Sequence, residues 1–179
     1  MKKFLFSVAF LALASVAFAQ DGPQNIIKVN IISPILKTGS FFFEHALNEK
    51  SSFQLGVGFT AFKQEEEDVK ISGIFITPEY RMYLSASKTA PAGFYVGPYL
   101  RYQNLKIEDE FDKATLSTFG GGVVAGHQWI FRDRFSLDLF LGPNYNSGNV
   151  KVTSGSEPDV PTTFKGFGIR TGVTFGIAF

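Results

Sequence analysis

Large apolar residues and small or polar residues alternate along most of the chain with a period of two. In the segment from Phe167 to Phe179, the odd positions are large or β-branched, whereas the even positions are Gly, Ala, Thr or Arg. Because successive side chains of a strand point to opposite faces, this alternation predicts a β-strand with two different surroundings. The same period recurs in segments that begin at Phe53, Ile74 and Phe94.

Repeated alternation without a helical period after residue 20 predicts an all-β chain. The expected fold is an eight-stranded antiparallel up-and-down transmembrane β-barrel preceded by a signal peptide. The expected strands are 25–34, 39–48, 51–63, 70–84, 92–106, 115–131, 134–146 and 164–179.

The connections between these segments alternate in length. One side has the turns 48–51, 85–91 and 132–133, which are short or moderate. The other side has the polar loops 64–68, 107–114 and 147–163, and a short first link at 35–38 that fits less well. Short periplasmic turns and longer external loops are typical of outer-membrane barrels.

The volume of a small barrel indicates which face points inward. An eight-stranded barrel is just wide enough for ordinary side chains to fill it, so the bulky face is expected outside and the small, Gly-rich face in the lumen. Charges in the strand bodies fall on the small face, and near the midplane of a bilayer an Arg or Lys facing lipid would cost about 2–4 kcal/mol. We expect these charges to form a structural network that plugs the lumen: Lys28, Glu44, Glu79, Arg81, Arg101, Asp138 and Arg170.

Three prolines fall within expected strands. Pro78, Pro98 and Pro143 each lack the amide hydrogen that a ladder needs. Proline in a strand that is paired on both sides is found mainly at irregularities, so bulges or widened pairings are expected at these positions.

The first 19 residues have the composition of a secretion signal. Lys2 and Lys3 precede an apolar run from Phe4 to Val16, and Ala17-Phe18-Ala19 is a small-x-small cleavage site. The run is shorter than the ~20 residues that a membrane-spanning helix needs. The expected organisation is a signal peptide at 1–19 and one barrel domain at 20–179, located in the outer membrane of a Gram-negative bacterium.

Composition excludes several classes of function. The leader takes two of the 17 basic residues and none of the 16 acidic ones, so the mature chain would carry one net negative charge. Without a basic run or aromatics interleaved with Lys and Arg, nucleic-acid binding is not expected. The absence of cysteine excludes a disulfide scaffold, a zinc–thiolate site and a cysteine lipid anchor.

The candidate catalytic and metal-binding patterns are weak. His45 and His127 fall on the outward face, and no serine and carboxylate are evidently placed to form a nucleophilic set with either, so interfacial positions are favoured. The acidic run 64–68 lacks the spacing of a calcium loop. The glycines 120–122 lack the Gly-Lys-Ser/Thr of a phosphate loop and are interpreted as strand glycines that allow curvature or close packing. No catalytic residue, metal or cofactor is therefore expected.

The final strand ends in an aromatic residue. Phe175, Ile177 and Phe179 stand at two-residue steps, and this ending resembles the assembly signal of bacterial outer-membrane barrels. The resemblance implies the barrel-assembly machinery as a partner.

Four segments resemble a family of small outer-membrane barrels of Bacteroidota, described only as a domain of unknown function. The segments are Ile27-Lys28-Val29-Asn30, the run from Phe43 to Lys50, the run from Thr77 to Tyr83, and the run from Gly93 to Tyr99. The architecture is similar to that of OmpA and OmpX barrels. No peptidoglycan-binding segment follows Phe179, so that anchoring role is not expected.

Three hypotheses about function remain open. The favoured one is a non-enzymatic structural or surface-interaction protein. Its expected partners are the outer-membrane lipid and lipopolysaccharide that surround it, and its surface ligand is unidentified. The protein is expected to be a monomer. The alternative is a narrow channel for ions or small solutes, suggested by the lumen charges. The third is a lipid-modifying enzyme, suggested only by the two histidines.

Overall fold

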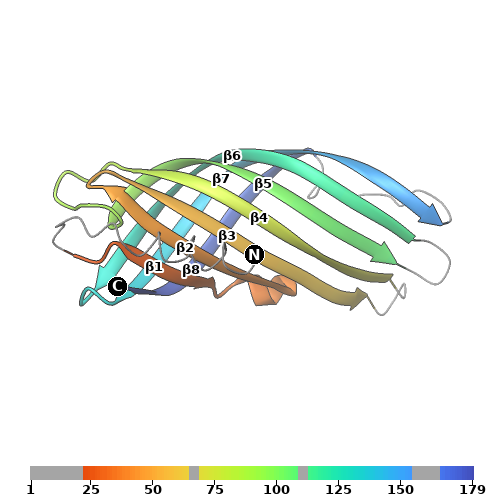
Figure 1. The fold of residues 1–179 in the computed structure, drawn as a ribbon, viewed down its shortest axis with the longest axis horizontal. Helices are drawn as coiled ribbons and strands as arrows, with labels where there is room; N and C mark the ends of the chain where they lie inside the picture. Colours follow the sequence, from red (N-terminus) through yellow and green to blue (C-terminus); the bar gives the residue numbers. More distant parts are fainter. Residues whose placement is uncertain (1–21, 65–68, 109–112, 155–165) are drawn as a thin grey trace, which may run out of the picture.

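The computed structural model describes residues 22–64, 69–108, 113–154 and 166–179. The expected signal peptide lies outside these residues. Within them the chain is all-β, and its eight antiparallel strands pair in sequence order until the first meets the last, which closes the barrel (Figure 1). The strands are β1 (Asn25–Asn30), β2 (Thr38–Asn48), β3 (Ser51–Gln64), β4 (Val69–Tyr83), β5 (Gly93–Glu108), β6 (Lys113–Phe131), β7 (Phe135–Ser154) and β8 (Gly166–Ala178).

The barrel closes through its two terminal strands. β1 pairs with β8 from Ile26↔Ala178 to Asn30↔Thr174. The Asn25 amide donates to the Phe179 carbonyl at 2.9 Å, and the Phe179 amide donates back at 2.8 Å. We call this the near end of the barrel; it also carries the β2–β3, β4–β5 and β6–β7 turns, and the opposite end is the far end (Figure 1).

The first strand is shorter than the sequence pattern predicts. β1 ends at Asn30 instead of residue 34, because the Asn30 side-chain oxygen accepts hydrogen bonds from the amides of Ile32 and Ser33 and turns the chain. A four-residue 3₁₀ helix, Ser33–Leu36, follows, with Pro34 in its first turn, where a missing amide hydrogen costs nothing. No helix in the described ranges is long and apolar enough to cross a membrane.

The far end of the barrel extends further than predicted. The expected loop 147–163 begins too early, since β7 continues to Ser154 and pairs there with Lys113 of β6. The alternation of Val150 and Val152 with polar residues continues the strand pattern, although the Gly and Ser residues around them are typical of a loop. β5 likewise continues to Glu108. Residues 65–68, 109–112 and 155–165 lie outside the described part of the chain, including all but Gln64 of the acidic run.

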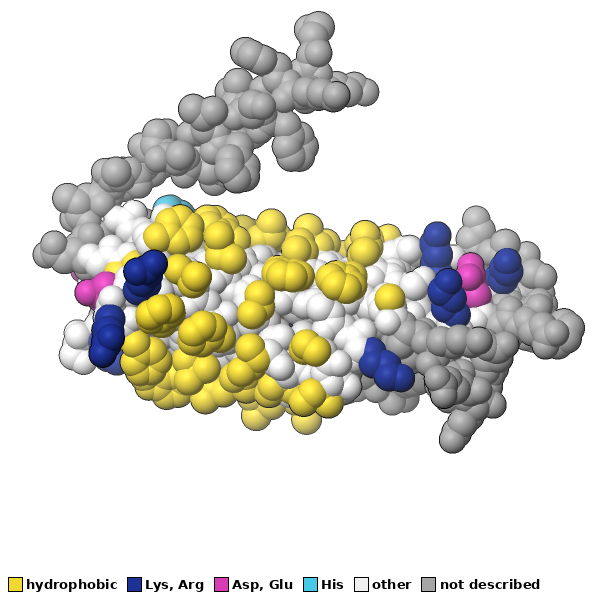
Figure 2. Space-filling model, turned by 90° about the horizontal axis from the view of Figure 1, so that it is seen from below, with side chains coloured by type: hydrophobic (Ala, Val, Ile, Leu, Met, Phe, Trp, Pro, Cys, Tyr) yellow, Lys and Arg dark blue, Asp and Glu magenta, His cyan; other side chains and the backbone are white. Residues whose placement is uncertain are grey.

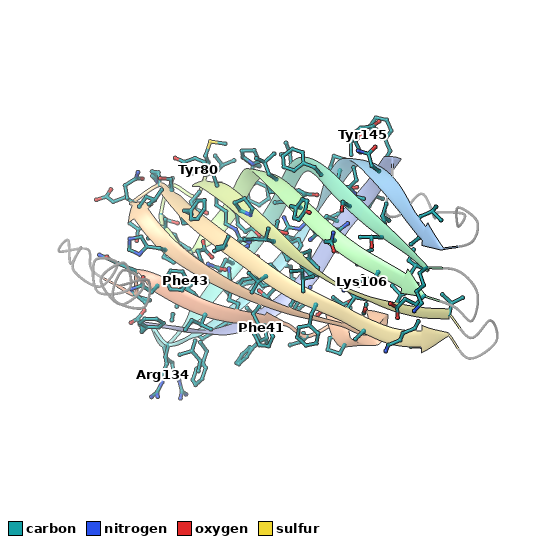
Figure 3. The ribbon with its side chains drawn as sticks, turned by 45° about the vertical axis from the view of Figure 1, so that its right-hand side comes forward. Phe41, Phe43, Tyr80, Lys106, Arg134 and Tyr145 are labelled. Atoms are coloured by element: carbon teal, nitrogen blue, oxygen red, sulfur yellow. The ribbon has the colours of Figure 1, made fainter. Side chains whose placement is uncertain are left out.

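The outer surface is apolar around the middle of the barrel. Figure 2 shows hydrophobic side chains over the central part of the face in view, with Lys, Arg and acidic side chains toward its two ends. Figure 3 shows Phe41, Phe43, Tyr80 and Tyr145 pointing away from the barrel. Many large side chains are about half exposed, among them Ile27, Phe41, Phe59, Leu100, Val123, Leu141 and Ile177. The bulky face of each strand is therefore the outer face.

The prolines leave gaps in the ladders without shifting the register. Pro78 remains opposite Leu55 of β3, but the β4–β5 ladder has no rung between Ile76↔Tyr102 and Glu79↔Tyr99. The ladder is interrupted in the same way beside Pro98 and Pro143, each on one side only. The ladders thus lose rungs on one side of each proline without the bulge that was one of the two expectations, because a proline faces only one neighbouring strand with the amide it lacks.

The glycines 120–122 mark a close approach of strand backbones. A Cβ on Gly122 would lie 2.1 Å from the Pro143 carbonyl oxygen of β7, and one on Gly121 would lie 2.4 Å from the Tyr99 carbonyl oxygen of β5. No side chain fits at such distances. The interpretation of these residues as close-packing strand glycines is confirmed.

Candidate functional site in the barrel lumen

The lumen is lined by a mixture of polar, charged and aromatic side chains. Lys28, Glu44 and Asp138 are fully buried, and so are several uncharged polar residues. The inner face is less uniformly small than its glycines predict, because Phe42, Phe140 and three tyrosines also fill it. The buried tyrosines are Tyr83, Tyr95 and Tyr99.

Glu44 on β2 is the most highly connected carboxylate. One of its oxygens accepts from Lys28 Nζ at 2.5 Å, from Gln128 Nε2 at 3.1 Å and from Arg81 Nη1 at 3.2 Å. The other oxygen accepts from Ser52 Oγ at 2.5 Å and from Tyr83 OH at 2.6 Å. Both oxygens are thus occupied, and strands from different sides of the barrel are joined.

Arg81 on β4 connects all three buried carboxylates. Its Nη1 lies 3.2 Å from Glu44 and 3.0 Å from Asp138, and its Nε lies 2.6 Å from Glu79. Its guanidinium also lies over the Tyr95 ring, with 4.1 Å between Cζ and the ring centroid. Asp138 on β7 completes its shell with Tyr95 OH at 2.9 Å.

Glu79 links this cluster to the next level of the lumen. Its second oxygen accepts from Arg170 Nη1 of β8 at 2.5 Å. Arg170 lies over two rings, at 4.2 Å from the Tyr99 centroid and 4.9 Å from the Phe140 centroid. The six residues Lys28, Glu44, Glu79, Arg81, Asp138 and Arg170, here called the ion network, thus form one connected set of ion pairs.

Arg101 is the one predicted network residue that the structure leaves outside the ion pairs. It is half-buried, its Nε donates to Thr77 Oγ1 at 3.1 Å, and its guanidinium lies over the Phe75 ring at 4.9 Å. In register it stands opposite Gly120 of β6, which has no side chain to offer. The alternation of side chains along the strand placed Arg101 on the correct face, but it could not show which partners the side chain would reach.

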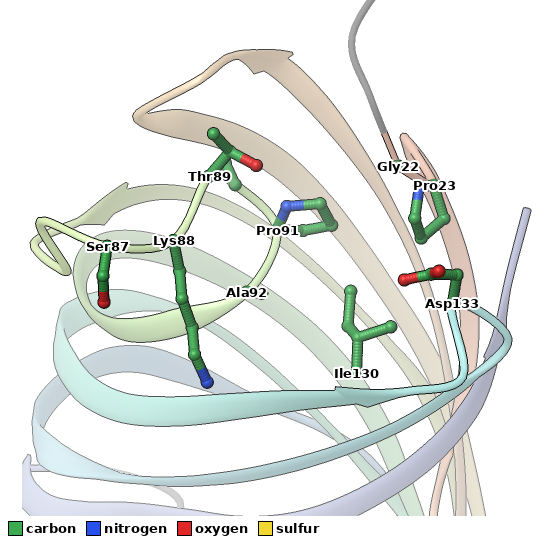
Figure 4. Close-up of a pocket in the computed structure, with 10 residues that line it drawn as sticks. Gly22, Pro23, Ser87, Lys88, Thr89, Pro91, Ala92, Ile130 and Asp133 are labelled. Atoms are coloured by element: carbon green, nitrogen blue, oxygen red, sulfur yellow. The ribbon is translucent and has the colours of Figure 1, made fainter.

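The near end of the lumen is closed by the turn between β4 and β5. Ala90 is buried there, its amide donates to the Glu49 carbonyl, and Gln128 Nε2 donates to the Pro91 carbonyl at 2.5 Å. A pocket of about 280 Å³ lies outside this closure, lined in part by Lys88 and Asp133 (Figure 4). The turn, expected only as a short connection, is thus part of the lumen filling.

Uncharged residues that sequence reasoning missed bond to the ion network. Gln128, Ser52 and the two tyrosines Tyr83 and Tyr95 bond directly to network charges. The alternation along their strands predicts that these side chains face the lumen. Their role was not predictable, since for Gln128, Tyr83 and Tyr95 it depends on bonding to strands far away in sequence.

The two histidines lie apart from the ion network. His45 Nδ1 is 2.8 Å from the Asn25 side-chain oxygen, and His127 packs on Trp129 with 4.2 Å between ring centroids. The hydrogen bonds of the described residues join neither histidine to a serine or a carboxylate. No group of three or more His, Cys, Asp or Glu within the described ranges is arranged to hold a metal.

The predicted C-terminal signal residues are exposed on the outer face. Phe175, Ile177 and Phe179 are about half exposed, and Phe175 stacks on Phe135 of the neighbouring strand with 6.1 Å between ring centroids. They lie at the near end, where β8 meets β1.

The comparisons with known proteins concern the family and the fold. A crystal structure of the N-terminal β-barrel domain of Pseudomonas aeruginosa OprF is similar at 16% sequence identity with a TM-score of 0.49, covering 89% of this chain and 100% of that one. A search of curated proteins found no match. The family model described as "Protein of unknown function (DUF3575)" matches residues 5–151, from the predicted leader into β7. With well over half of its length matched, the chain belongs to the DUF3575 family.

Proposed function

We propose that this protein is a non-enzymatic barrel of the Gram-negative outer membrane, with a lumen sealed by the ion network and a structural or surface-interaction role. The observation that carries the proposal is the contrast between its two faces. The exposed middle of the barrel is apolar, whereas the seven predicted lumen charges are turned inward and all but Arg101 are joined in ion pairs. A surrounding as apolar as lipid favours that arrangement, because apolar side chains are costly to expose to water and charges are costly to expose to lipid. Closure of the barrel also satisfies the backbone groups that lipid could not.

The packing of the lumen supports a structural role over a channel. Lys28, Glu44 and Asp138 have side chains with no exposed area, and Arg81 has 1%. A solute crossing this level would have to break several charge-assisted hydrogen bonds at once. Eight-stranded barrels leave little bore, and wide aqueous channels come with 16 or more strands.

The exposed aromatic ending of β8 supports delivery to the membrane by the barrel-assembly machinery. Phe175, Ile177 and Phe179 present one apolar row at the near end, which the proposal places on the periplasmic side after cleavage of the leader near Ala19. In this orientation the far end, where β3, β5 and β7 end at Gln64, Glu108 and Ser154, faces outward, where a ligand would meet it.

The experiment is gel mobility of the isolated outer-membrane fraction with and without boiling in detergent. Folded barrels stay closed when unboiled and migrate faster. We expect a heat-dependent shift of the native chain, and less folded protein in the membrane for Phe179→Ser. Phe94→Ser, which changes an exposed aromatic away from the C-terminus, is the matched control. Recovery of the native chain from the soluble periplasm without a mobility shift would contradict the proposal.

A further inference from the structure

The charges in the lumen do not balance. The ion network and Arg101 together supply four cations, Lys28, Arg81, Arg101 and Arg170, against three carboxylates. The oxygens of Glu44, Glu79 and Asp138 are each already bonded to a cation, a tyrosine or a serine. No carboxylate of the network therefore remains to compensate Arg101.

The excess positive charge lies at one level of the lumen. Arg101 and Arg170 bond to Thr77 and Glu79, which stand two residues apart on the inner face of β4. Arg170 also lies over Tyr99 of β5. The positions that flank Arg101 in register are Gly120 and, across the gap in the β4–β5 ladder, Thr77.

Polar side-chain atoms at this level lack hydrogen-bond partners among the described residues: two guanidinium nitrogens of Arg170, and also Tyr99 OH and Asn144 Oδ1. Arg170 is 5% exposed, yet its Nε and Nη2 atoms are buried without a hydrogen-bond partner. No hydrogen bond of Arg101 Nη1 or Nη2 occurs among the described residues. Leaving donors of a buried charged group unmet is more costly than leaving neutral ones unmet, so a filled site is favoured.

We propose that Arg101 and Arg170 form a binding site for a small monovalent anion inside the lumen, with chloride as its simplest occupant. The anion would accept hydrogen bonds from the free guanidinium donors and restore the charge balance. Its size is limited because the site lies between Glu79 and the Gln103–Thr118 pair, joined at 3.1 Å, within a barrel just wide enough for side chains. The site is independent of the proposed cellular role.

The test is a titration of the ¹⁵N-labelled mature chain, refolded in non-ionic detergent micelles, with sodium chloride against sodium gluconate at equal ionic strength. Gluconate is too large for the site. The reporter is the Arg170 side-chain Nε–H signal. We expect a saturable shift with chloride and no such shift with gluconate.

Two variants distinguish site binding from general screening. Arg101→Gln removes one arm of the site and is expected to raise the half-saturating chloride concentration by about tenfold or more, as loss of charge-assisted hydrogen bonds implies. Lys106→Gln removes the same charge from the outer face of β5 and is expected to leave the titration unchanged. Arg101→Lys, which keeps the charge, is expected to retain saturable binding.

Several outcomes would overturn the proposal. Equal effects of chloride and gluconate on the native chain would mean that water alone fills the site. An Arg101→Gln titration identical to that of the native chain would also contradict it. If neither Arg101 variant refolds, the contrast between chloride and gluconate in the native chain decides the question.

Discussion

The near and far halves of the lumen use similar side chains but differ in how completely their charges are paired. In the near half, Glu44 and Asp138 form ion pairs with Lys28 and Arg81 and accept hydrogen bonds from neutral donors. Gln128 joins Glu44 to the β4–β5 turn. In the far half, Arg101 has no carboxylate and Arg170 has two unused nitrogen atoms.

The two halves differ in the pairing of their charged groups, and not in the pairing of every polar atom. Hydroxyl groups without partners occur in the near half as well, on Ser51, Ser136 and Thr174. A neutral hydroxyl is much less costly to bury unpaired than a charge. The comparison therefore teaches that the near half is built to close the barrel and the far half to leave charge available.

Removing one charge from the near half should have the largest effect. Glu44→Gln keeps the shape but leaves Lys28 and Arg81 with less compensation, and we expect a loss of about 3–5 kcal/mol in the free energy of unfolding, typical of breaking a buried pair. Urea unfolding in micelles, followed by Trp129 fluorescence, measures it. Glu49→Gln on the exposed turn is the control. A loss under 1 kcal/mol for Glu44→Gln would show that the network is not needed for stability.

One substitution made in both halves sharpens the comparison. Gln128→Met removes bonds to Lys28, Glu44, Tyr83 and the Pro91 carbonyl, and we expect about 2–3 kcal/mol of destabilisation because several buried groups lose a partner. Gln103→Met removes one bond, to Thr118, and should cost about 1 kcal/mol. The same unfolding assay compares them, and equal costs would remove the distinction between the halves.

A methyl group placed between strands tests the close approach of β6 and β7. Gly122→Ala puts a Cβ against the Pro143 carbonyl, and we expect about 1–3 kcal/mol of destabilisation, as overpacking usually causes. Ala125→Val, on the outer face of the same strand, adds atoms where space is open and serves as the control. Equal melting temperatures of the two variants would contradict the close packing of β6 and β7.

The smallest effect is expected where the charge is already unpaired. Arg101→Gln in chloride-free buffer should change the free energy of unfolding by no more than about 0.5–1 kcal/mol, since Arg101 makes one side-chain hydrogen bond and no ion pair among the described residues. Chemical unfolding in gluconate buffer measures this change. A loss as large as that of Glu44→Gln would show that Arg101 is part of the stabilising network.

Much of this fold could be predicted from sequence because a barrel strand repeats one simple rule. The alternation in β8 and in the segment from Phe53 separates lipid-sized from lumen-sized side chains, and the strand ends follow within a few residues. The strand ends that were predicted wrongly have local causes. The Asn30 side chain turns the chain at the end of β1, and the Gly and Ser residues of β7 are typical of a loop although they lie in the strand.

The candidate site was predictable only in part. The alternation of side chains placed each of the seven charges on the inner face, because a charge near the midplane of a bilayer is tolerated only there. This alternation does not show how far a side chain extends or which partner it meets. It therefore could not show that Arg170 bonds to Glu79 while Arg101 bonds to Thr77. It also could not show that the β4–β5 turn folds into the near end, where Ala90 is buried.

The measurement that tests the sealed lumen most directly is the conductance of the purified native chain in planar bilayers. We predict traces without steady open steps at any salt concentration, because a passing ion must displace the ion network at Glu44 and Arg81. Reproducible steps whose size rises in proportion to the salt concentration would contradict the sealed lumen and would establish the narrow channel in its place.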